Sequence, residues 1–339
     1  MKIGLLFAGQ GAQYSGMGKS LYDHSSKSQR IFDLAGDEIK NWCFEGSKDI
    51  LKQTNVTQPC IYTVELAAYE AFMEALSGLT DSKRDSIEIS GMAGFSLGEY
   101  AALTAGGVIQ DFQAGLNIVR QRGQWMNEAG KDADGENKGG MIAAFGERER
   151  IIQCVEKARE TGILEAVNFN SPVQTVVAGD KEALKRFRTE AKAFGQIKAV
   201  PLSVSGAFHS PMMEPAAEKL RELLSQTEIQ KPSMKIYANI TGRDLMDGYE
   251  KGSEEFSNPS QWITDVMARQ AKSPVYWQET IENMYEDGIH ILIEFGPGTT
   301  LSGLAKKINP AVETMNVQDY ESLTATMERI KELMEERSN

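Results

Sequence analysis

Residues 87–105 read IEISGMAGFSLGEYAALTA, and this stretch decides the fold class. The apolar run from Ile87 to Ala93 predicts a buried strand, and the residues from Glu99 to Ala105 predict a helix. Between them stands Gly94-Phe95-Ser96-Leu97-Gly98, the G-x-S-x-G pattern of a sharp strand-to-helix turn. Glycine suits both ends of such a turn because side chains there would collide with the neighbouring strand and helix. We therefore expect an α/β protein.

Ser96 lies at the tip of this turn and is the candidate nucleophile. Its hydroxyl would project from the start of a helix, where the N–H of Leu97 and the helix dipole can stabilise the oxyanion of a tetrahedral intermediate. The alternative is a tight turn with a structural role only, because a five-residue pattern often occurs by chance. The predicted strand before it and the predicted helix after it favour the nucleophile.

Other segments predict the rest of a larger α/β unit. Residues 2–7 form an apolar run that is typical of a buried strand and that ends in the loop AGQG. Residues 234–240 and 290–298 predict two more strands, and helical spacing of apolar residues is found at 56–76, 113–129, 262–269 and 276–285. Residues 325–339 predict an amphipathic, solvated terminal helix with a charged end.

A second, smaller unit follows the polar, glycine-rich region from Lys131 to Gly140, which marks a domain boundary. From Gly140 to residue 204 the predicted order is strand, helix, strand, strand, helix, strand, the signature of a ferredoxin-like α+β unit. We expect a large catalytic domain with a central parallel sheet, formed by residues 1–128 and 199–339. The ferredoxin-like subdomain would be inserted in it at residues 129–198.

A serine nucleophile needs a base, and the chain has only three histidines. His24 lies in a polar segment and His290 opens a predicted strand, so surface exposure and strand packing explain them. His209 stands in a loop of small residues where Pro211 ends regular structure, and such a loop can present a side chain to a cleft. His209 is the candidate base, with a structural role equally open on these residues alone.

Arg122 is the candidate anion-binding residue. It lies on a predicted helix with an otherwise apolar face, where burial would strengthen a bidentate contact with a carboxylate. A structural ion pair is the alternative. No Asp or Glu between the serine and His209 stands out as the group that orients the imidazole, so a backbone carbonyl could take that place.

The composition limits the class of protein. The sequence holds 36 basic and 48 acidic residues, a net charge of −12, which argues against general binding to nucleic acid or an anionic membrane. Three widely spaced cysteines without a CxxC pair indicate reduced thiols and not a disulfide framework or a zinc cluster. The N-terminal apolar run is too short for a signal peptide, and no run reaches the length of a membrane span. We expect a soluble cytoplasmic protein.

Together these motifs resemble the free-standing bacterial malonyl-CoA:acyl carrier protein transacylases, and they are similar to the acyltransferase domains of polyketide synthases. The resemblance covers nearly the whole chain and keeps the family's order. It rests on FAGQGAQ at 7–13, TQP at 57–59, GFSLGEYAAL at 94–103, Arg122-Gly123, NFNSP at 168–172, AFHSPMM at 207–213 and EFGPG at 294–298. The large domain is accordingly expected to be α/β-hydrolase-like.

The resemblance also implies roles for particular residues. Ser96 would be the nucleophile and His209 the base, with the backbone N–H groups of Gln10 and Leu97 as the oxyanion hole. Arg122 would bind the free carboxylate of malonate, and Gln58 would line the same pocket. Phe208 matches the phenylalanine that is usual in malonyl-selective members. The main-chain carbonyl of Gln270 would orient the imidazole.

One residue departs from the family pattern. Relatives usually have histidine immediately before the nucleophile, where this chain has Phe95. The change removes a polar side chain from the pocket floor, so it bears on acyl selectivity and on the orientation of the carboxylate. It does not bear on the base, which the resemblance implies is His209.

The implied reaction is transfer of a malonyl group from malonyl-CoA, through an acyl-serine intermediate, to the thiol of acyl carrier protein in fatty acid biosynthesis, with no metal or other cofactor. The free-standing form suggests a monomer. Alternatives on the same fold are an acyl hydrolase and an acyltransferase of a polyketide pathway; a noncatalytic docking module is expected to have lost the serine or the histidine.

Carrier proteins are acidic, so an enzyme of net negative charge needs a local cationic surface to bind one. The candidate cations lie on the second predicted helix of the small unit and after the GPG loop, and they are Lys181, Lys185, Arg186, Arg188, Lys192, Lys306 and Lys307. A solvated helix face is the alternative interpretation.

Overall fold

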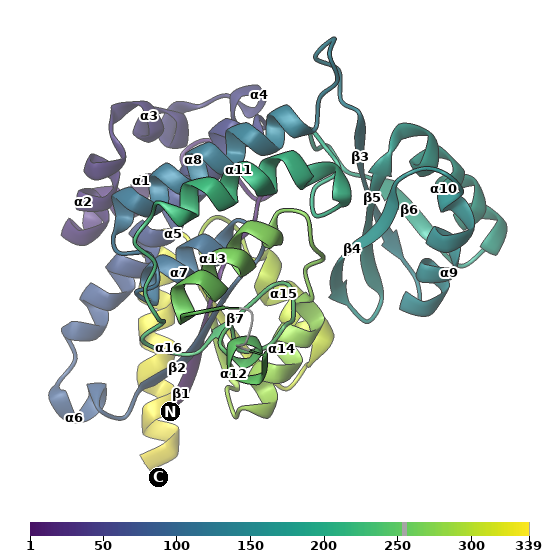
Figure 1. Cartoon of the computed structure of the whole chain (residues 1–339). Helices are drawn as coiled ribbons and strands as arrows, with labels where there is room; N and C mark the ends of the chain where they lie inside the picture. Colours follow the sequence, from purple (N-terminus) through teal and green to yellow (C-terminus); the bar gives the residue numbers. More distant parts are fainter. Residues whose placement is uncertain (253–255, 339) are drawn as a thin grey trace.

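The computed structural model describes residues 1–252 and 256–338. Its strands form two sheets, and Figure 1 shows the smaller sheet with its two helices beside the larger body of the molecule. The larger sheet is parallel throughout, in the order β7-β2-β1-β8-β9. Its strands are β1 (Lys2–Phe7), β2 (Glu88–Gly94), β7 (Ile236–Tyr237), β8 (Ile291–Phe295) and β9 (Glu313–Val317). The predicted α/β class with a central parallel sheet is confirmed.

Helices surround this sheet. Those of the first quarter of the chain are α1 (Lys19–His24), α2 (Ser26–Ala35), α3 (Asp37–Glu45), α4 (Lys48–Leu51), α5 (Thr54–Ser77) and α6 (Asp81–Arg84). Those that follow the nucleophile turn are α7 (Gly98–Ala105) and α8 (Phe112–Ala129). Those after the small unit are α11 (Glu214–Ser225), α12 (Asp247–Gly252), α13 (Pro259–Gln270), α14 (Trp277–Glu286), α15 (Thr300–Ile308) and α16 (Tyr320–Ser338), with a short 3₁₀ turn at Pro211–Met213.

The centre of the core is β1 with α5 beside the sheet. Five of the six residues of β1 are buried, as a strand with neighbours on both sides and helices on both faces requires. The helix α5 is apolar around most of its circumference because α2, α8 and the sheet cover it from several sides. These buried elements place the carboxyl ends of β1, β2 and β8 at one edge, where the loops of the site begin.

The smaller sheet is antiparallel, in the order β4-β5-β3-β6. Its elements are β3 (Gly139–Phe145), α9 (Arg148–Arg159), β4 (Leu164–Ser171), β5 (Gln174–Asp180), α10 (Lys181–Phe194) and β6 (Lys198–Pro201). Both helices pack on one face of the sheet around Phe187 and Ile151. The predicted limit of the unit at residue 198 coincides with the first residue of β6, which pairs with β3 as far as Pro201.

Two sequence predictions were wrong in detail. The strand expected at 234–240 is only Ile236–Tyr237, because the backbone N–H of Ala238 bonds to Arg243 and the chain turns back on itself. The C-terminal helix is longer than expected and is not a solvated appendage. Its apolar side buries Leu323, Met327, Ile330 and Leu333 against the large core, beside β9 and α5.

Candidate active site

The turn between β2 and α7 is as tight as the glycines predict. A Cβ on Gly94 would lie 2.0 Å from the backbone of Gly98, and a Cβ on Gly98 would lie 2.2 Å from the carbonyl oxygen of Phe7. Ser96 has φ 52°, the left-handed region that a residue with a side chain rarely occupies. Such a conformation costs about 1–3 kcal/mol and persists only where surrounding bonds enforce it. In this conformation the hydroxyl of Ser96 projects out of the turn.

The hydroxyl of Ser96 contacts both the candidate base and the candidate anion-binding residue. Its Oγ lies 2.7 Å from Nε2 of His209 and accepts a hydrogen bond from Nη2 of Arg122 at 3.2 Å. His209 comes from the loop before the 3₁₀ turn and has φ 61°, with its backbone N–H donating to Ala271. Three segments that are far apart in the sequence thus meet at one oxygen atom.

The other ring nitrogen of His209 defines its tautomer. Nδ1 lies 3.0 Å from the carbonyl oxygen of Gln270 and 3.1 Å from that of Ser273. Carbonyl oxygens only accept hydrogen bonds, so Nδ1 must carry the proton and Nε2 must present a lone pair to Ser96. The Gln270 carbonyl expected to orient the imidazole lies at hydrogen-bond distance, and the second carbonyl, of Ser273, was not foreseen.

Burial of the imidazole, with the charge of Arg122 as a second cause, lowers the pKa of His209 from 6.5 to about 4. A protonated Nε2 cannot accept the serine proton. We expect the rate at which an uncharged aryl fluorophosphonate labels Ser96 to be constant above a pH of about 4 and to fall about tenfold per pH unit below it. Labelling would be measured by intact mass, so that substrate ionisation does not enter the profile.

Arg122→Ala provides the comparison for this pH profile. Without the guanidinium the pKa of His209 rises, so the acid limb of labelling should move to higher pH. An unchanged limb would contradict the assignment of the titration to His209. The unfolded chain binds the imidazole proton more readily than the folded one, so the free energy of unfolding also falls as pH drops from 6.5 toward 4. Circular dichroism at each pH separates that loss from the loss of labelling.

Arg122 is 1% exposed and is held by neutral groups. Its Nη1 donates to Oε1 of Gln58 at 2.8 Å and its Nη2 donates to Oε1 of Gln270 at 2.9 Å, while the guanidinium lies 5.2 Å from the ring centroid of Tyr100. Its Nε has no hydrogen-bond partner. In residues 1–252 and 256–338 no carboxylate pairs with it. The charge of buried Glu99 acts on the guanidinium without forming an ion pair with it, so the group keeps room for an anionic ligand at its free side.

The remaining predicted residues line a cavity of about 100 Å³ around Ser96. Gln58, Phe208 and Leu97 are buried in its wall, and Gln10 is half-buried where the loop after β1 reaches it. The backbone N–H groups of Gln10 and Leu97 donate to no acceptor within the described part of the chain. The structure therefore brings every predicted site residue to the same place.

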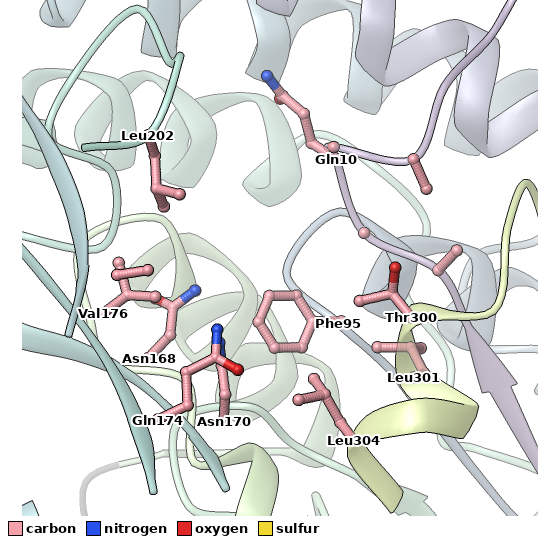
Figure 2. A pocket seen from close by; sticks show the side chains of 15 residues that line it. Gln10, Phe95, Asn168, Asn170, Gln174, Val176, Leu202, Thr300, Leu301 and Leu304 are labelled. Carbon is pink, nitrogen blue, oxygen red and sulfur yellow. The ribbon is translucent and has the colours of Figure 1, made fainter. Parts of the chain in front are cut away.

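A larger cavity of about 240 Å³ adjoins the first, and both share Gln10, Phe95, Asn168 and Leu202. Figure 2 shows side chains of the small sheet on one side of it and side chains of α15 on the other, with the ring of Phe95 between them. Phe95 packs edge-on against Trp277, with ring centroids 5.4 Å apart. The phenylalanine thus contributes an apolar wall to both cavities.

Several residues of the site were not assigned by the sequence analysis. Asn168 and Asn170 line the larger cavity, and their Oδ1 atoms are buried without a hydrogen-bond partner. Both lie in the segment NFNSP, which signalled the family but gave no role. Thr300, Leu301 and Leu304 form the opposite wall and come from a helix that the sequence analysis did not predict.

The other histidines lie elsewhere. His24 is exposed and stacks on Tyr320, and His290 stacks on Tyr285 at the start of β8. The described residues include no group of three or more His, Cys, Asp or Glu side chains arranged to hold a metal ion. Among the same residues, no helix has the length and apolarity needed to cross a membrane.

A strained serine, a neutral imidazole and unpaired backbone N–H groups define a serine-dependent acyl-transfer enzyme, and the buried guanidinium adds a place for an acyl chain that ends in an anion. The chain belongs to the acyl transferase domain family, whose model matches residues 5–335.

Three comparisons describe its relatives. The malonyl CoA-acyl carrier protein transacylase of Bacillus subtilis strain 168 is 36% identical over 337 residues, which cover 98% of each chain. The structure of the protein of that name from Clostridium perfringens is 36% identical, covers all of both chains and superposes with a TM-score of 0.86. A malonyl-transacylase solved in complex with its type II polyketide-synthase acyl carrier protein is 32% identical, with a TM-score of 0.85 over 97% of this chain and all of that one.

Proposed function

We propose that this enzyme transfers the malonyl group of malonyl-CoA to the phosphopantetheine thiol of acyl carrier protein, as an [acyl-carrier-protein] S-malonyltransferase of fatty acid biosynthesis. The observation that carries the proposal is the guanidinium of Arg122, buried without a carboxylate partner at 3.2 Å from the hydroxyl of Ser96. A malonyl thioester supplies both missing parts, a free carboxylate for the guanidinium and a carbonyl carbon for the hydroxyl. Relatives named for this reaction match over the full length.

The first half-reaction follows from the hydrogen bonds. Nε2 of His209 takes the proton from Oγ of Ser96 as Oγ bonds to the thioester carbon. The carbonyl electrons move to oxygen, and the N–H groups of Gln10 and Leu97 would stabilise that oxyanion. When the tetrahedral intermediate collapses, the C–S bond breaks and His209 returns the proton to the CoA sulfur. A malonyl ester of Ser96 remains.

The second half-reaction reverses these steps with another thiol. His209 takes the proton of the phosphopantetheine thiol, the sulfur attacks the ester carbon, and Oγ of Ser96 leaves with the proton. Through both steps the carboxylate would stay on Arg122, which Gln58 and Gln270 hold in place. Phe208, buried in the wall of the same cavity, would exclude acyl groups bulkier than malonyl.

An acyl hydrolase is the nearest rival, because only the acceptor differs. The two functions are separated by following free CoA and malonyl-carrier protein together with purified enzyme. We expect CoA release to depend on the concentration of the carrier protein, with one malonyl-carrier formed for each CoA. CoA release at the same rate without carrier would contradict the transferase. The control is the carrier protein without its phosphopantetheine, which lacks the acceptor thiol and should not raise the rate of CoA release as the holo-carrier does.

We further propose finer features of the fold and the setting. The strand order β4-β5-β3-β6 with helices on one face supports a ferredoxin-like small unit, and the strand-turn-helix around Ser96 supports an α/β-hydrolase-like large one. The three cysteines are buried free thiols, which suits the reducing cytoplasm. A monomer is the proposed state, and light scattering on a sizing column would test it.

The carrier protein is proposed to dock on α10. Four of the predicted cations there are exposed, namely Lys181, Lys185, Arg188 and Lys192. Arg186 is instead engaged, since it donates to the carbonyl oxygens of Ala158 and Arg159. The helix packs on the face of the small sheet that holds Ile142 and Val177. Ala143 and Val176, on the opposite face, line the larger cavity, so a carrier on α10 would reach the site around the edge of this sheet.

Charge reversal tests this surface. We expect Lys185→Glu combined with Arg188→Glu to raise the KM for carrier protein about tenfold at low salt, with the KM for malonyl-CoA unchanged, because surface charges act on encounter. Lys331→Glu, an exposed lysine on α16, is the matched control. A KM for carrier protein that stays at the wild-type value in the double variant would remove α10 from the docking surface.

A further inference from the structure

The main chain of Ser96 is held by side chains from two distant segments. Oδ1 of Asn239, just after β7, accepts the backbone N–H of Ser96 at 2.7 Å. Nδ2 of the same amide donates to the carbonyl oxygen of Gly94 at 2.6 Å. Nε2 of Gln270 donates to the carbonyl oxygen of Ser96 at 2.6 Å. The roles proposed above use none of these three bonds.

We propose that Asn239 is a positioning residue for the reaction, whose amide clamps the nucleophile turn and keeps Ser96 in the conformation that reaches His209. This inference rests on the proposed function, because the turn is useful only if Ser96 is the nucleophile. Asn239 lines neither of the two cavities at the site, so it acts through the serine and not on the substrate.

The conformation of Ser96 explains why a clamp is needed. A serine at φ 52° is in a sparsely populated region and returns to a relaxed backbone unless other bonds prevent it. One planar amide bonds to the two peptide groups that precede Ser96, through the carbonyl of Gly94 and the N–H of Ser96. In the turn these two backbone groups have the side-chain amide of Asn239 as their hydrogen-bond partner, in place of the backbone partner that a strand or helix would supply. Loss of the amide leaves the turn free to relax.

Asn239 is itself fixed from two directions. Oε1 of Glu99, in the first turn of α7, accepts the backbone N–H of Asn239 at 2.9 Å. The carbonyl oxygen of Asn239 accepts the N–H of Tyr276 at 2.8 Å. Glu99 is 4% exposed and Asn239 is 1% exposed, so little water competes for these bonds. Glu99, which directly follows the G-x-S-x-G pattern, therefore fixes the position of Asn239 relative to α7.

The bond from Gln270 determines where the N–H of Leu97 points. In a trans peptide the C=O and the following N–H point in opposite directions. The bond from Gln270 to the carbonyl of Ser96 therefore aims the N–H of Leu97 away from Gln270, and that N–H has no acceptor within the described residues. Asn239 and Gln270 together orient the peptide groups before and after Ser96, and hence both the nucleophile and its proposed oxyanion donor.

The test measures the rate at which Ser96 is labelled by malonyl-CoA and by an aryl fluorophosphonate, which needs the serine and the base but no carboxylate site. We expect Asn239→Ala to slow both reactions about 100-fold, the effect of a misplaced reacting group. The half-saturating malonyl-CoA concentration should stay the same while the maximal rate falls. Asn239→Asp keeps an acceptor for Ser96 but loses the donor to Gly94, and we expect about tenfold slower labelling with both reagents.

Asn283→Ala is the matched control, because it also removes an asparagine bond to a backbone carbonyl, that of Gly242, without contact to the turn. It should label at the wild-type rate. The proposal is overturned if Asn239→Asp, or a folded Asn239→Ala, labels within about threefold of wild type with both reagents. If wild type reacts with fluorophosphonate but not with malonyl-CoA, the proposed function fails, while the fluorophosphonate comparison still decides the role of Asn239.

Discussion

Replacing Ser96 by alanine is expected to lower malonyl transfer about 10⁶-fold, because the covalent route disappears with the hydroxyl. His209, Arg122 and the backbone N–H groups would remain, so substrate binding should persist while no ester forms. The variant keeps the small side chain that the turn requires. The measurement is malonyl-carrier formation by mass spectrometry, with equilibrium binding of malonyl-CoA measured in parallel.

Ser90→Ala is the control for this variant. Ser90 lies on the same strand β2, but its hydroxyl bonds to Oε1 of Glu88 and faces neither cavity of the site. It should transfer malonyl at the wild-type rate. Substantial transfer by Ser96→Ala, or equal losses in both serine variants, would show that the acyl group passes through another residue.

Arg122→Ala is expected to have the second largest effect, a change of substrate and not only a loss of rate. Removing the partner of a buried carboxylate costs about 2–5 kcal/mol, so malonyl transfer should fall by about 30- to 4,000-fold. Acetyl-CoA has no carboxylate to leave unpaired, so its transfer should fall much less and should gain relative to malonyl. The measurement is kcat/KM for both thioesters in wild type and variant.

Arg120→Ala is the matched control on the same helix, since Arg120 is exposed and pairs with Glu38 at 3.5 Å. It should leave the ratio of malonyl to acetyl transfer unchanged. Because Nη2 of Arg122 also bonds to Oγ of Ser96, some loss with acetyl-CoA is expected as well. Equal losses with both thioesters would mean that Arg122 holds the serine and does not recognise the carboxylate.

The parts of the site that sequence could predict are those coded by short local patterns. Gly94, Ser96 and Gly98 occur within five residues, and the steric reason for both glycines is local to the turn. The candidate base was found because only three histidines exist and only His209 stands in a loop of small residues. The burial of Arg122 followed from the apolar face of its helix.

The parts that could not be predicted depend on contacts between distant segments. No sequence pattern near Asn239 predicts that its amide binds the backbone of Ser96, 143 positions away. The strand before Asn239 is only two residues long and gives no local signal either. The carbonyl of Ser273 reaches His209 only because α13 ends beside it. The burial of α16 was missed for the same reason, since an amphipathic pattern does not say whether a partner covers its apolar side.

Phe95 is the departure from the family that the structure explains in part. Its ring packs on Trp277 and forms one apolar wall of both cavities. The nucleophile turn is unaffected, because it is Asn239 and Gln270 that bond to the backbone on either side of Ser96.

The most direct test of the account is the mass of the enzyme after brief exposure to malonyl-CoA, followed by addition of holo-acyl carrier protein. The account predicts one malonyl group per chain, located by peptide mass analysis on Ser96, and its quantitative transfer to the carrier when the carrier is added. A malonyl group on any other residue, or an ester on Ser96 that is lost to water while the carrier stays unmodified, would contradict it.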